Sequence, residues 1–170
     1  MDKHLLRIFQ MQVLDQCKYL LASAKGIDAG LANMDVDQTM YFLQNLLNAG
    51  ANISKMLWGQ RGKKANDRAL LRASIGISDG SPLRQVTMRN NFEHMDERID
   101  KWWRESENKN YVDKNFGSKE SFLTNQPIDK FRIFDPKSRD IIFWGEEFST
   151  QDLVTEALRI MPILKREIYN

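Results

Sequence analysis

SPLRQVTMRNNFEHMDERIDKWWRES, residues Ser81 to Ser106, predicts one long amphipathic helix. Ser81 is a residue type that caps helices, and Pro82 would occupy the first helical position, where a missing N–H costs nothing. Because apolar side chains recur at three- and four-residue steps, we expect one face of this helix to be buried. The apolar stripe consists of Met88, Phe92, Met95, Ile99 and Trp102.

The opposite face of the same predicted helix is polar. At about 100° per residue, Asn90 and His94 fall one above the other, nearly opposite the stripe, and Arg89 falls between the two faces. His94 is one of only two histidines in the chain. The sequence therefore predicts a polar cluster displayed away from the core, and this cluster is the candidate for chemistry.

The composition is that of one ordinary globular domain spanning residues 1–170. Apolar residues make up 42% of the chain and charged residues 28%, which argues against wholesale disorder. The net charge of +2 is too small to indicate nucleic acid by itself. The single cysteine, Cys17, excludes a disulfide framework and a cysteine-based zinc site. No signal peptide is apparent and no apolar run approaches the roughly 18 residues of a membrane span, so we expect a cytoplasmic protein without membrane contact.

Helical periodicity dominates the first half of the chain. The spacing predicts a helix over Asp2–Lys25 that ends at Gly26. A second helix is predicted to begin at the capping pair Asp35 and Gln38. It continues to Trp58, provided that another helix approaches closely at Gly50. A shorter third helix is predicted from about residue 67 to residue 76.

The second half contains the predicted departures from helix. Residues 107–129 lack a clean period and are expected to form a long loop. Residues 131–134 and 141–144 flank a turn former, Asp135-Pro136, which predicts a β-hairpin. A last helix is predicted from Ser149 or Thr150. Together these elements predict an all-α, up-and-down bundle of four to five helices with a small inserted β-hairpin near residues 130–145.

Residues Arg89 to His94, RNNFEH, place an arginine, a polar residue, three further positions and a histidine in a row. This arrangement resembles the R-x4-H motif of the HEPN superfamily, small helical-bundle proteins of which many are ribonucleases of toxin–antitoxin and anti-phage systems. In that family the residue after the arginine is typically Asn, Asp or His, as Asn90 is here. The resemblance implies a homodimer with paired motifs at its cleft.

The residue types suit cleavage of RNA without a metal or other cofactor. Histidine can move a proton near neutral pH, which would make His94 a general acid or base acting on the ribose 2′-OH or the leaving oxygen. The forked donors of Arg89 can stabilise charge on the phosphate, and Asn90 can orient the imidazole. On a continuous helix Arg89 and His94 diverge by about 140°, so we expect a two-fold dimer to bring two copies together.

A second group of cations is a candidate for guiding an RNA backbone. A solvated loop and helix face is the commoner explanation for such a run of charge. We do not expect a metal site, because the carboxylates near the motif have one histidine and no second cluster beside them. The candidate RNA-binding cations are Arg61, Lys63, Lys64, Arg68 and Arg72.

Three functions remain open on the sequence. The leading prediction is a metal-independent endoribonuclease of toxin–antitoxin or defence type, acting on RNA and accompanied by a cognate antitoxin or a nucleotidyltransferase-type partner. The alternative is a non-catalytic HEPN-like dimer that binds a nucleotide, RNA or a partner protein. The third is a structural bundle in which Arg89 and Glu93, four residues apart, form an ordinary surface ion pair and His94 is merely solvated.

Overall fold

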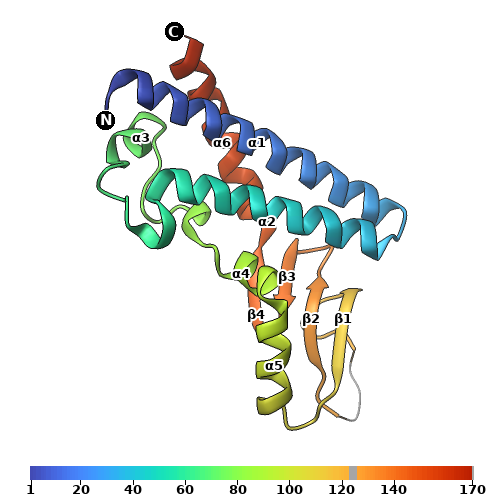
Figure 1. The fold of residues 1–170 in the computed structure, drawn as a ribbon. Coiled ribbons are helices and arrows are strands. Elements are labelled where there is room, and N and C mark those ends of the chain that lie inside the picture. Colours follow the sequence, from blue (N-terminus) through green and yellow to red (C-terminus); the bar gives the residue numbers. More distant parts are fainter. Residues whose placement is uncertain (123–125, 170) are drawn as a thin grey trace.

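The computed structural model describes residues 1–122 and 126–169, and it corrects the expected fold class (Figure 1). Within these residues the protein is mixed α/β, with six α-helices and one four-stranded sheet. The prediction of an all-α bundle is therefore wrong. Two short 3₁₀ turns, η1 (Gln60–Gly62) and η2 (Pro82–Arg84), complete the described elements.

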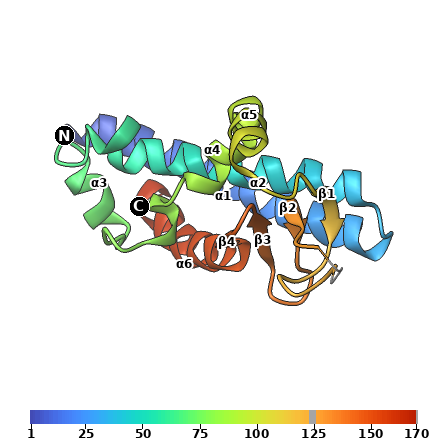
Figure 2. The same cartoon turned by 90° about the horizontal axis from the view of Figure 1, so that it is seen from below.

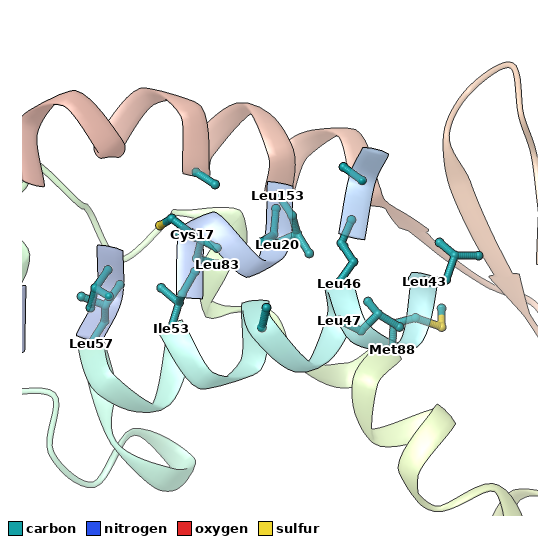
Figure 3. Packing of buried hydrophobic residues seen from close by; sticks show 14 of the residues in the cluster. Cys17, Leu20, Leu43, Leu46, Leu47, Ile53, Leu57, Leu83, Met88 and Leu153 are labelled. Carbon is teal, nitrogen blue, oxygen red and sulfur yellow. The ribbon is translucent and has the colours of Figure 1, made fainter. Parts of the chain in front are cut away.

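The first and largest part of the fold is a layer of long helices. Asp2 and Asp35 cap the two N-terminal helices of this layer, and Asp35 accepts from the backbone N–H of Gln38 at 2.9 Å, as predicted. The apolar faces of the three helices meet in a continuous core, part of which is drawn in Figure 3. The helices are α1 (Lys3–Ala32), α2 (Val36–Trp58) and α6 (Thr150–Tyr169).

The predicted end of the first helix at Gly26 is wrong, because α1 continues to Ala32. Both glycines near its end face α2 at close range. A Cβ at Gly26 would collide with the Phe42 ring, and one at Gly30 would lie 2.9 Å from the backbone nitrogen of Thr39. Here glycine lets two helices approach each other instead of ending one of them.

The sheet follows α5 in the chain and has the order β1-β2-β3-β4 (Figure 1). Strands β2 and β3 form the predicted antiparallel hairpin, with Ile133 opposite Ile142. The loop expected over residues 107–129 is wrong in part, since β1 lies within it and pairs with β2 in parallel; residues 123–125 of that loop lie outside the described residues. The strands are β1 (Tyr111–Phe116), β2 (Asp129–Phe134), β3 (Asp140–Phe143) and β4 (Glu146–Ser149).

The long helix expected over residues 81–106 is also wrong. After η2 the chain forms α4 (Thr87–Glu93), is interrupted at His94, and continues as α5 (Met95–Glu105). The expected buried stripe survives only in part, because Met88, Phe92 and Trp102 are buried whereas Ile99 is 40% exposed.

The interruption at His94 directs α5 along the sheet, on the opposite side of α2 from α6 (Figures 1 and 2). Trp102 packs against Tyr111 and Phe131 of the sheet, with ring centroids 5.1 and 6.1 Å apart. The buried amide of Asn91 links α4 to β4 and to α5, because it donates to Glu146 at 2.9 Å and accepts from Arg98 at 2.8 Å. In the described part of the chain, no helix combines the length and apolar character needed to cross a bilayer.

Candidate functional site

A groove of about 860 Å³ lies between the C-terminal half of α2 and the interrupted segment that contains the motif. The α2 wall includes Ser54 and Trp58, and the turn that follows it contributes residues 59–62. The other wall carries all three predicted catalytic residues, which are Arg89, Asn90 and His94.

Arg89 is held within this wall. Its side chain is 19% exposed and forms a two-contact ion pair with Glu93, including a hydrogen bond of 2.8 Å from Nη2 to Oε1 and a close contact between Nη1 and Oε2. Nη1 also donates to Asn90 Oδ1 at 3.4 Å. Arg89 Nε is buried and has no acceptor among the described residues. The predicted i,i+4 ion pair is therefore confirmed, and one guanidinium donor is left unused.

His94 lies at the interruption itself, where ψ is 43° and the helical path breaks. Its side chain is 47% exposed. Its Nε2 lies 3.9 Å from Glu93 Oε2, the same oxygen that Arg89 Nη1 contacts, and its Nδ1 lies 3.5 Å from Glu97 Oε1. The divergence expected for a continuous helix is therefore wrong: guanidinium and imidazole converge on one carboxylate oxygen within a single chain.

The groove has an excess of positive charge. Among the described residues it is lined by five permanent cations and two carboxylates, Glu93 and Glu97. An excess of positive charge attracts a polyanion and raises the concentration of that polyanion near the groove. The five cations are Lys55, Arg61, Arg84, Arg89 and Arg98.

Beside the groove, the Asp79 carboxylate lies within ion-pair distance of Arg84 and of Arg72, which is outside the groove lining. The indole N–H of Trp58 donates to its carboxylate at 2.7 Å, and Arg84 lies 3.3 Å from the same oxygen. The hydrogen bond from Trp58, assisted by Arg84 and Arg72, holds the pKa of Asp79 below its usual range. Asp79 therefore stays ionised and forms an ion pair with Arg84 at the groove.

The five cations predicted to guide an RNA backbone do not act as one rim. Arg61 lines the groove, whereas Lys63 and Lys64 are exposed outside its lining. Arg68 lies over the Phe9 ring at 3.7 Å, and Arg72 donates to two backbone carbonyls at 2.8 and 2.7 Å. Arg68 and Arg72 are both half-buried, and these contacts give their side chains a packing role in the described structure.

Sequence reasoning did not place three groove residues at the site, namely Lys55, Arg84 and Arg98. Lys55 comes from the second helix, and no local pattern links it to the motif. Arg98 follows His94 by four residues, a spacing that could have suggested a shared face. Among residues 1–122 and 126–169, no group of three or more His, Cys, Asp or Glu side chains is arranged to hold a metal ion.

No family model, curated protein or solved structure matches the chain at a significant level. The resemblance to HEPN proteins therefore stays a prediction that depends on residues 89–94.

Proposed function

We propose that the protein is a metal-independent endoribonuclease whose reaction takes place at Arg89, Asn90 and His94. The observation that supports this proposal is the convergence of Arg89 Nη1 and His94 Nε2 on one oxygen of Glu93, at the wall of a groove with excess positive charge. A phosphoryl oxygen in the place of this carboxylate oxygen would lie between the guanidinium of Arg89 and the imidazole of His94.

The cleavage step follows from the chemistry of these groups. The ribose 2′-oxygen attacks phosphorus and the P–O5′ bond breaks, which leaves a 2′,3′-cyclic phosphate and a free 5′-hydroxyl. One proton must leave the 2′-OH and one must reach the leaving oxygen, and we assign both transfers to His94, because an imidazole can accept and donate a proton. Arg89 stabilises the negative charge that develops on the phosphate, and Asn90 orients the neighbouring groups.

Glu93 must give up Arg89 before a phosphate can bind there, since the ion pair occupies two guanidinium donors. Arg89 Nε is buried, so a phosphate would contact the guanidinium through Nη1 and Nη2 once Glu93 has released them. Such an i,i+4 pair is worth only about 0.3–0.5 kcal/mol, so a substrate phosphate can displace it.

The predicted partners are RNA and a second copy of the chain, in the cytoplasm, with a cognate antitoxin or a nucleotidyltransferase-type protein as a further partner. A two-fold dimer would place Arg89 of one copy beside His94 of the other, so that one cleft would hold two composite sites.

The test is cleavage of a single-stranded RNA in EDTA by purified protein. Wild type should produce 2′,3′-cyclic phosphate ends, and His94→Ala and Arg89→Ala should each lower the rate by about 10²- to 10⁴-fold with unchanged melting temperature. His4→Ala and Arg104→Ala remove the same groups outside the groove and serve as controls. Equal rates in all four variants would contradict the proposal.

The composite dimer has its own test. If Arg89 of one copy acts with His94 of the other, mixing the two inactive variants should restore about a quarter of the wild-type activity, because half of the dimers contain one intact site of two. A dimer that shows no restoration would mean that each chain uses its own pair, and the nuclease proposal would stand without the composite site.

A non-catalytic binding module is the second candidate, and the ion pair between Arg89 and Glu93 favours it, because the guanidinium is already neutralised. If the protein is such a module, wild type and His94→Ala should bind RNA with the same Kd. Neither wild type nor Glu93→Gln should then cut RNA.

A further inference from the structure

The turn after α2 holds Arg61 in an uncommon backbone conformation. Its φ of 55° and ψ of 28° lie in the left-handed region, between Gly59 and Gly62, whose φ values are also positive. A residue with a long side chain is rare in this region, and such strain gathers at functional sites. The turn therefore presents Arg61 at a conformational cost.

The turn is braced by the inward-facing Arg72. Its Nη1 donates to Leu57 O at 2.8 Å and to Ala65 O at 2.7 Å, which fixes the chain on both sides of the turn. The backbone N–H of Lys64 also donates to Trp58 O at 2.9 Å. Arg61 is therefore displayed from a rigid support.

Arg61 and Lys55 are the groove cations whose side chains have no hydrogen-bond or ion-pair partner among the described residues. Both are exposed, one on the turn and one on the last turns of α2. The other three groove cations each have such a partner, and they are Arg84, Arg89 and Arg98.

We propose that Lys55 and Arg61 form a second phosphate-binding site, which takes a backbone phosphate of a single-stranded RNA adjacent to the phosphodiester at Arg89 and His94. This inference rests on the proposed function. RNA is favoured over an acidic protein segment because both sites line one groove, so a strand cut at the first must place its other phosphates along that groove. The two unpartnered cations thereby position the substrate without taking part in bond cleavage.

Binding of 2′-O-methyl oligouridylates tests the inference without any cleavage, because these ligands lack the attacking hydroxyl. Fluorescence anisotropy compares an eight-nucleotide ligand with a two-nucleotide ligand that has a single internucleotide phosphate. The variant Lys55→Gln/Arg61→Gly keeps a helix-forming residue on α2 and relieves the left-handed strain, so its melting temperature should not fall. A variant of equal charge loss outside the groove, Lys25→Gln/Lys165→Gln, is the control.

For the eight-nucleotide ligand we expect the groove variant to raise Kd roughly tenfold and to flatten the slope of log Kd against log salt by about 0.7, the value for one lost phosphate. The two-nucleotide ligand and the control variant should show no change. An unchanged Kd for the longer ligand overturns the inference, and so does wild-type binding of polyaspartate with no binding of RNA. Cleavage lost in His94→Ala but unaffected by Lys55→Gln/Arg61→Gly would retain the nuclease and reject the second site.

Discussion

Two stretches that look alike in sequence fold in opposite ways. Residues 2–25 were expected to end at a glycine, yet α1 runs on through Gly26 and Gly30 to Ala32. Residues 81–106 were expected to form one helix, yet they are interrupted at His94. In the first case α2 packs against the glycines, and in the second the sheet and Asn91 draw α5 aside. Helix length is thus decided by the neighbouring element, while local pattern decides only which face is apolar.

The largest effect on stability is expected when a side chain is added at Gly30, where α1 and α2 are in close contact. Alanine is the better helix former by about 1 kcal/mol, but its Cβ would lie 2.9 Å from the backbone nitrogen of Thr39. We expect Gly30→Ala to lower the free energy of unfolding by about 1–3 kcal/mol, measured by urea denaturation. Gly50→Ala is the matched control, since its Cβ would meet only the Leu153 side chain at 3.4 Å and should cost little. A Gly30→Ala protein as stable as wild type would contradict the packing role.

Substitutions of Asn90 and Asn91 test which side chain holds the chain in its interrupted path at His94. Asn91→Ala leaves Arg98 and Glu146 without their shared amide and should cost about 1–2 kcal/mol in the free energy of unfolding. Asn90→Ala removes only a 3.4 Å contact with Arg89 and should change stability by less than about 0.5 kcal/mol while lowering the proposed nuclease activity. Equal costs for the two variants in chemical denaturation would show that Asn91 does not hold the interruption.

The variant Glu93→Gln tests whether Glu93 competes with an RNA phosphate for Arg89. The change should cost only a few tenths of a kcal/mol in stability, about the worth of an i,i+4 pair, and it frees Arg89. We therefore expect tighter binding of 2′-O-methyl RNA, measured by anisotropy at fixed salt. Glu97→Gln removes an equal charge from the groove but does not touch Arg89, and it should improve binding less. The reverse order would place Glu97, not Glu93, in competition with the phosphate.

The smallest effect concerns the start of the motif segment. Glu156 of α6 accepts from Ser81 Oγ at 2.9 Å, and its hydrogen bonds from Arg159, followed by that from Ser81, lower its pKa below the ordinary 4.5. A lowered pKa in the folded state contributes stability above about pH 4.5, and this contribution is lost as the pH falls through the folded-state value. The stability difference between wild type and Glu156→Gln should therefore shrink in urea titrations as the pH falls below about 4.5. A constant difference would exclude this role.

Features encoded by adjacent residues could be predicted from the sequence. The Asp35 cap, the start of α6 at Thr150, the β2–β3 hairpin and the Arg89–Glu93 ion pair all depend on residues a few positions apart. Strand β1 could not be found in this way, because its partner β2 runs parallel and starts eighteen positions later. The groove was equally hidden, since Lys55 reaches it from another helix.

The order of elements along the chain has a consequence for synthesis. Helix α6 follows every other described element, yet it covers the apolar faces of α1 and α2 and accepts from Ser81. A nascent chain that has not reached Thr150 carries the motif residues without the framework that aligns them. We expect ribosome-stalled chains ending at Ser149 to be cut rapidly by a protease and full-length chains to resist, which would delay any activity at the groove until translation has passed α6.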